Sequence, residues 1–251
     1  MAGVDLSGAS LVGADLSDAS LFGANLTGAD LAYADLKGAD LSDSQLAKAN
    51  FVGANLTGAR LKNARVDDTK FQGAALENAA LEGLGIDVDA IARTSPLVKP
   101  AEFPAEIASA FDGHETWVRT MGGSGRPAVL RGAKLDYIDL AGRDLSGIDL
   151  TEARLVGARF VGANLTLATL DRVNLTGADL SNCSLRGARL SGAILRSAVL
   201  AMASVGDVPI RDRSGHRTGR IRRTNLAGAD LLNAKLEGLD LSACLLDPGR
   251  G

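Results

Sequence analysis

Residues 24–43 read ANLTGADLAYADLKGADLSD, four successive copies of a five-residue unit in which leucine follows Asp or Asn and alanine precedes both. Leucine or another apolar residue returns at every fifth position within residues 6–86, 130–205 and 226–246. A repeat of this length takes precedence over local signals, because it is the sequence signature of an architecture built from stacked units. The question is which backbone can place residues five apart in one interior.

A period of five fits neither a strand nor an α-helix. Alternate residues of a strand face opposite sides, so residues five apart would alternate between core and solvent. In an α-helix a five-residue step ends about 140° away from where it began, which would spread the leucines around the whole cylinder. A chain that turns a corner after each unit keeps one large and one small residue of every unit inside. The three remaining positions hold polar and turn-forming residues, as an outer surface requires.

The unit Ala-(Asp/Asn)-Leu-x-x, as at residues 14–18 and 54–58, resembles the motif of the pentapeptide-repeat family over most of the chain. The resemblance implies an all-β solenoid, a right-handed quadrilateral β-helix in which four units make one coil. Coils about 4.8 Å apart would then stack residues twenty positions apart into columns. One such column would place Phe51 directly on Phe71.

Breaks in the repeat divide the chain into segments. Within the first long break, apolar residues recur at steps of three and four from Ile107 to Met121, as on one face of a helix. The spacing between the two repeat blocks fixes no stacking phase, so one continuous rod and two separate rods both remain open. The expected segments are repeat block 1 (1–86), an insert (87–129) with an amphipathic helix (about 104–121), repeat block 2 (130–205), a basic hairpin (206–223), a final coil (224–246) and a tail (247–251).

His114 and Trp117 lie on the apolar face of the expected helix and are candidate anchors of the insert. They would either dock the helix onto an open coil end, where exposed leucines need a cover, or contact a ligand or partner. A capping role is the simpler interpretation, because a solenoid must cover its ends. We therefore expect His114 and Trp117 to attach the helix to the coils.

The second break carries six arginines against two aspartates around Ser214-Gly215, a typical turn, and predicts a protruding basic hairpin. Such a hairpin would grip an acidic protein or a nucleic-acid backbone. It has no interleaved aromatic residues to stack on bases, which disfavours nucleic acid. An ordinary solvated loop is the alternative. The candidate partner-binding residues are Arg211, Arg213, Arg217, Arg220, Arg222 and Arg223.

The sequence carries no pattern for catalysis, and we expect no enzymatic activity, no cofactor and no metal. Only two histidines are present, without a nucleophile elbow or a phosphate-binding loop. Cys183 and Cys244 both take the small inward position of the repeat, which favours buried packing over a redox or metal pair. No apolar run of about eighteen residues and no signal peptide is found. The resemblance implies a bacterial cytoplasmic location.

Two functions of different class remain. The first is an interaction scaffold or a structural or targeting module that binds a protein partner of unknown identity. The second is DNA mimicry, as in family members that bind gyrase. B-DNA carries one negative charge per about 1.7 Å, whereas this chain has a net charge of −3. Residues 1–86 hold eleven acids and six bases, and residues 131–205 hold seven acids and nine bases. The scaffold is therefore favoured.

The ends of the repeat carry no recognisable capping segment. The repeats begin at Val4 and end at Leu246, close to both ends of the chain. Because a solenoid needs its terminal coils covered, we expect either a homodimer through uncapped coil ends or a chain that forms part of a longer protein.

Overall fold

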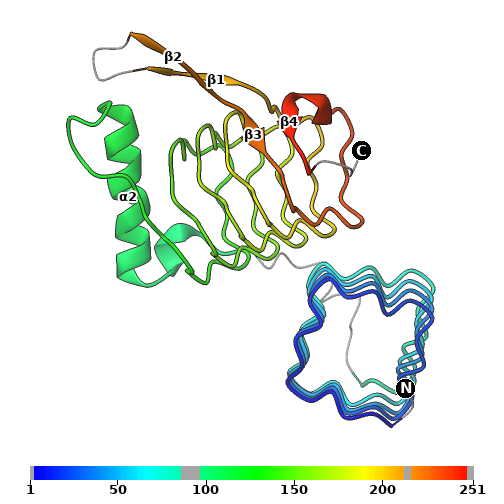
Figure 1. Ribbon diagram of the computed structural model, residues 1–251. Coiled ribbons are helices and arrows are strands. Elements are labelled where there is room, and N and C mark those ends of the chain that lie inside the picture. Colours follow the sequence, from blue (N-terminus) through cyan, green and yellow to red (C-terminus); the bar gives the residue numbers. More distant parts are fainter. Residues whose placement is uncertain (1–2, 86–96, 212–215, 248–251) are drawn as a thin grey trace. The chain divides into compact units, whose positions relative to one another are not determined.

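A computed structural model describes residues 3–85, 97–211 and 216–247 of the chain (Figure 1). The chain divides into two compact units, Met1–Pro96 and Leu97–Gly251. Each unit has its own cluster of buried apolar residues. The two repeat blocks therefore belong to two separate cores. Some sequence-based expectations concern residues outside the described ranges: these are Ile86, the first part of the insert (87–96), Arg213, the Ser214-Gly215 turn and the tail from residue 248 onward.

The first unit consists of stacked coils of twenty residues. Asp15 forms a parallel single-residue bridge with Asp35, and Asp35 forms the next one with Asn55. The Leu16 N–H donates to the Asp35 carbonyl at 2.7 Å, and the Asp35 N–H donates to the Ala14 carbonyl at 2.9 Å. A turn follows each bridge, and Figure 1 shows a four-sided outline for this unit. The expected twenty-residue columns are confirmed, although the coils contain little regular sheet because each bridge is one residue long.

Stacked apolar columns fill the first unit. Phe51 lies on Phe71 with ring centroids 5.3 Å apart and ring planes 9° from parallel, which confirms the expected column. Both rings are fully buried. By contrast, Leu6, Leu11 and Leu16 in the first coil are only half-buried. The homodimer expected through uncapped coil ends stays a prediction, and these leucines are where it would form.

The second unit repeats the same coil until the hairpin interrupts it. Bridges twenty residues apart run from Val129 with Asp149 to Ser184 with Ser204. The next bridge joins Arg189 to Asn225, so the intervening chain is longer than one coil. The stacking then resumes on the same faces. The last coil contains β3 (Thr224–Asn225), η2 (Leu241–Ala243) and β4 (Cys244–Leu245), and β4 pairs with β3 in parallel.

The interruption forms a two-stranded antiparallel hairpin of β1 (Val208–Arg211) and β2 (Arg217–Arg222). Val208 pairs with Arg222, Pro209 pairs with Ile221, and the register shifts before Arg211 pairs with Arg217. Such an irregularity bends a strand and increases its twist. Figure 1 shows the hairpin projecting from the coils of the second unit.

Two short helical elements precede the coils of the second unit, η1 (Pro100–Glu102) and α2 (Ala105–Arg119). Pro104 directly before α2 and Glu106 in its first turn suit a helix start. Phe111 is 1% exposed and belongs to the second core, and Ile107 packs against that core. The helix therefore covers apolar residues of this unit's first coils. Among the described residues, no helix has both the length and the apolar character to cross a membrane.

Candidate functional site

The β1–β2 hairpin carries the candidate partner-binding arginines. Arg217 and Arg220 are exposed on β2, whereas Arg222 at the end of that strand is half-buried. Arg222 pairs with Val208 and Arg217 pairs with Arg211, three positions further along β1. Cross-strand partners share a face and side chains alternate along a strand, so Arg217 and Arg222 lie on opposite faces. Arg211 lies in β1, and Arg213 is outside the described residues. The hairpin thus presents cations from both faces of β2.

Polar contacts fasten the base of the hairpin to the coils. Arg223 Nε donates to Asp207 Oδ1 at 2.9 Å, and Arg186 Nη2 donates to the Asp207 carbonyl oxygen at 2.8 Å. The hydrogen bond from Arg223 holds the pKa of the Asp207 carboxyl below its usual range, so the carboxylate stays charged at more acidic pH than a free aspartate does. The buried hydroxyl of Thr224 donates to the Leu185 carbonyl at 2.8 Å. Arg223 therefore anchors the hairpin.

A second cluster of charge lies beneath β2. Arg189 forms an ion pair with Asp171, whose side chain is mostly buried. The pKa of Arg222 lies below its usual range, first because burial removes its guanidinium from water and second because Arg189 is positive. Asp171 offsets part of this effect. Arg222 therefore brings a second cation next to Arg189, and Asp171 is one carboxylate facing the two.

The candidate anchors His114 and Trp117 lie together on α2, with ring centroids 5.7 Å apart. His114 is fully buried, and its Nδ1 accepts a hydrogen bond from the Ala128 N–H at 3.1 Å. The neutral imidazole therefore carries its proton on Nε2. Trp117 is half-buried and its ring lies over Gly147, where a Cβ would be 3.9 Å from Trp117 Cη2. His114 and Trp117 thus each contact a residue of the second unit outside α2.

Acid should weaken this attachment through His114. Burial lowers the pKa of His114 in the folded protein. Asp144 and Glu115, and then the Leu145 backbone, offset part of this lowering. The unfolded chain then takes up the proton first, so the free energy of unfolding should fall as the pH drops below about 6.5.

Urea denaturation of the wild type and of His114→Asn tests this at about pH 7 and about pH 5. The asparagine amide can accept the Ala128 hydrogen bond but does not titrate in this range. The wild type should therefore lose more stability on acidification than the variant. An equal loss in both proteins would show that His114 is not responsible.

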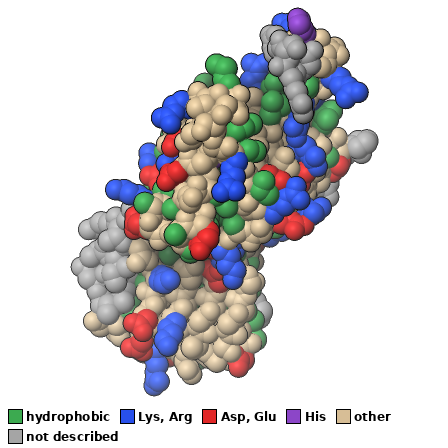
Figure 2. Space-filling model, turned by 90° about the vertical axis from the view of Figure 1, so that its left-hand side faces the viewer, with side chains coloured by type: hydrophobic (Ala, Val, Ile, Leu, Met, Phe, Trp, Pro, Cys, Tyr) green, Lys and Arg blue, Asp and Glu red, His purple; other side chains and the backbone are tan. Residues whose placement is uncertain are grey.

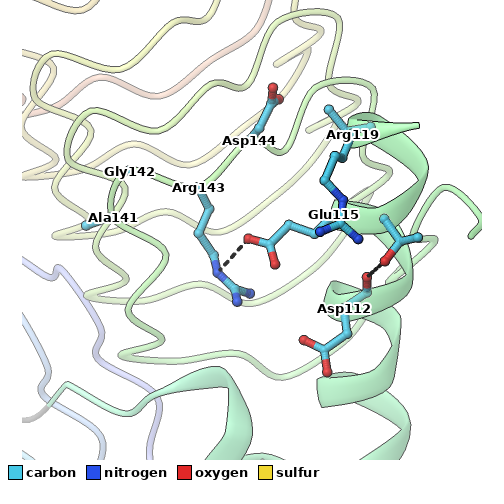
Figure 3. A pocket seen from close by; sticks show the side chains of 9 residues that line it. Asp112, Glu115, Arg119, Ala141, Gly142, Arg143 and Asp144 are labelled. Carbon is cyan, nitrogen blue, oxygen red and sulfur yellow. Dashed lines mark hydrogen bonds and ion pairs between the residues drawn. The ribbon is translucent and has the colours of Figure 1, made fainter. Parts of the chain in front are cut away.

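A cavity of about 530 Å³ lies between α2 and the coil turn at residues 141–144 (Figure 3). On its walls, Glu115 Oε1 lies 3.6 Å from Arg143 Nε. The Arg143 guanidinium also lies over the Phe111 ring, 5.9 Å from its centroid. Figure 3 shows these two charged side chains pointing toward one another across the cavity. An ion pair and a cation–π contact in one place suit attachment of the helix.

The described residues offer neither a grouped set of metal ligands nor an exposed thiol. Within the ranges that the structure covers, no three His, Cys, Asp or Glu side chains are grouped so that they could hold a metal ion. Cys183 and Cys244 are buried free thiols. Burial raises the pKa of Cys183 to about 12 and that of Cys244 to about 11. A thiol that stays protonated is a poor nucleophile, so both cysteines serve as small packed side chains.

The repeat matches a known family model, that of pentapeptide repeats, in eight copies. Together the matched residues make up more than half of the chain. The chain therefore belongs to the pentapeptide-repeat family. No curated protein is significantly similar to it. The matched ranges are 1–38, 24–63, 34–73, 49–83, 133–172, 144–182 and 174–205.

Several solved structures are similar to parts of this chain, at low overall similarity. Rfr23 from the cyanobacterium Cyanothece 51142 is 28% identical over 50% of this chain and 65% of its own, with a TM-score of 0.30. A protein of the Arabidopsis thaliana thylakoid lumen is 32% identical over 43% and 61%, with a TM-score of 0.30. QnrB1, a plasmid-mediated fluoroquinolone resistance protein, is 14% identical over 91% of each chain, with a TM-score of 0.29. The chain spans less than two thirds of the length of the first two proteins.

Sequence reasoning missed several residues that shape the site. Arg186 fastens the hairpin base and Arg143 holds α2, yet both occupy ordinary outward positions of the repeat. Nothing in the sequence indicates that these outward side chains have partners. Glu115 could have been found, because Asp112, Glu115 and Arg119 recur at helical steps opposite the apolar face. Its partner, Arg143, could not have been found in this way, because the contact between them depends on where α2 docks on the coils.

Proposed function

We propose that the chain is a non-enzymatic interaction scaffold in which the coils form a right-handed quadrilateral β-helix and the β1–β2 hairpin binds an acidic protein partner. One observation carries the proposal. The base of the hairpin is held through Asp207 by Arg223 and Arg186, while Arg217 and Arg220 beyond it are exposed. A strand with a fixed base presents its cations at defined positions, which reduces the entropy cost of binding and favours one register of the partner.

The chemistry of the hairpin favours an acidic protein over nucleic acid. Residues 206–223 contain no Phe, Trp or Tyr that could stack on a base. Nucleic-acid binding without stacking depends on many phosphate contacts along a backbone. Two of the arginines, Arg222 and Arg223, are already half-buried or ion-paired at the hairpin base. The exposed arginines that remain are better matched to a few carboxylates.

Removing the hairpin charge should abolish binding to an acidic probe. We expect immobilised polyglutamate to retain the wild-type protein, and a variant with all six hairpin arginines replaced by serine to bind at least about ten-fold more weakly. Surface plasmon resonance at several salt concentrations measures both. The control removes six exposed cations from the coil faces and should bind like the wild type: Lys48, Lys62, Arg65, Lys70, Lys134 and Lys235, each replaced by serine. Unchanged binding of the hairpin variant, or tighter binding of duplex DNA than of polyglutamate, would overturn the proposal.

DNA mimicry has less support from the arrangement of charge. A mimic needs acidic columns that continue from coil to coil. In the first unit, Asp35 bridges Asp15 on one side but Asn55 on the other. In another column Asn50 is followed by Lys70. The acidic columns thus end within the unit. Inhibition of gyrase supercoiling by micromolar protein would reverse this ranking.

A further inference from the structure

The two segments that interrupt the repeat, α2 and the β1–β2 hairpin, both pack on one column of turns in the second unit. Gly147, Leu167 and Gly187 occupy equivalent turns in successive coils, twenty residues apart. Trp117 of α2 covers Gly147, as described above. At Gly187 a Cβ would lie 2.9 Å from Leu167 Cδ2 and 3.1 Å from Val208 Cγ2 of β1, so a larger residue there would press on both side chains. The helix and the hairpin therefore flank Leu167 from opposite sides.

An open groove of about 340 Å³ lies at this place. One wall is formed by Trp117 and Val118 of α2 and by Met121 just beyond the helix, and the turn at Thr166 and Leu167 lies against them. Met121 is 97% exposed, and Trp117 and Leu167 are only half-buried. Exposed apolar side chains around a groove can bury an apolar side chain of another molecule, which removes both surfaces from water.

Positive charge surrounds the hairpin side of the groove. Arg186, next to Gly187 on the same coil, is exposed and donates to a backbone carbonyl of the hairpin base. The pKa of Arg222 at the end of β2 is lowered first by burial and second by the nearby charge of Arg189. The hairpin continues outward with exposed Arg217 and Arg220. Figure 2, which views the molecule from the side of α2, shows Lys and Arg side chains beside hydrophobic ones, with Asp and Glu side chains among them.

We propose that this groove, from Trp117 and Met121 to Leu167, is the specificity site of the scaffold. It receives an apolar side chain from an acidic segment of the partner protein, while neighbouring carboxylates of that segment meet the arginines of the hairpin. The inference rests on the proposed function and adds that the acidic segment of the partner must also carry an apolar side chain. The apolar contact selects the segment, and the charge contact accelerates and orients its arrival.

Synthetic peptides test the proposal with the full-length protein. The first has glutamates flanking two leucines, the second has serines in place of the leucines, and the third has lysines in place of the glutamates. Fluorescence anisotropy should show binding of the first peptide, at least about ten-fold weaker binding of the second, and none of the third. The protein variant Leu167→Asn should also weaken the first peptide by about ten-fold. Asparagine tolerates the backbone there, where φ is 62°, so the fold should be preserved.

Met202→Asn is the matched control. Met202 also has a positive φ, 58°, and is 65% exposed, but it lies outside the groove. This variant should bind the first peptide like the wild type. If the peptides with and without leucines bind equally and Leu167→Asn has no effect, the groove is not the site, although the hairpin proposal stands. If no acidic peptide binds, both proposals are overturned.

Discussion

Replacing Phe51 with alanine should destabilise the first unit by about 4 kcal/mol, because it empties the middle of a stacked column. Phe51 is fully buried and its ring contacts that of Phe71 at a centroid distance of 5.3 Å. Each coil contacts only its neighbours, so the cavity has few other side chains to fill it. In urea, monitored by circular dichroism, the midpoint of the first unit should fall by about 2 M.

Because the two units have separate cores, the unfolding of each can be followed separately. The chain has a single tryptophan, Trp117, and it lies in the second unit. Its fluorescence should therefore report an unchanged transition in Phe51→Ala. The control is Phe22→Ala, since Phe22 is 47% exposed and its loss should cost less than about 1 kcal/mol. Equal effects of the two substitutions would mean that the Phe51 column is not the core of the first unit.

The repeat predicts the apolar interior of each unit once it is combined with the family resemblance. A period of five, taken with the family resemblance, placed Phe51 on Phe71 and Asp15 beside Asp35, as observed. This succeeds because a coil core is one-dimensional, so sequence spacing and spatial neighbourhood are related by a fixed number of residues. Handedness is different. Neither the period nor the pattern of outward residues depends on the direction in which the chain turns.

The candidate site could be predicted only in its parts. Spacing alone indicated a helix at about 104–121, and α2 spans Ala105–Arg119. The composition of residues 206–223 indicates a hairpin, but its position over Gly187 follows from a close approach of β1 to that corner, which composition does not encode. Leu167 gave a weak signal, an aliphatic residue at a turn position where Gly, Asn or Asp is usual. The helix and the hairpin lie on the same column of turns because of how each packs on the coils. No local sequence pattern encodes this packing.

Replacing Phe111 with alanine should detach α2 and cost the second unit about 3 kcal/mol. Phe111 is 1% exposed within the second core, and the Arg143 guanidinium lies over its ring. Alanine returns a few tenths of a kcal/mol through its higher helix propensity, which is too little to offset the lost packing. Helical ellipticity should decrease, and Trp117 fluorescence should shift to the red at lower urea than in the wild type.

Met121→Ala serves as the control, because Met121 is 97% exposed just beyond the end of α2 and its loss should change the free energy of unfolding by less than about 0.5 kcal/mol. The two variants also separate attachment of the helix from binding at the groove. Phe111→Ala should lose both helix docking and affinity for the leucine-containing acidic peptide, whereas Met121→Ala should lose only affinity. If Phe111→Ala kept its helical ellipticity and its stability, the docking of α2 would have to depend on His114 and on the ion pair between Glu115 and Arg143 instead.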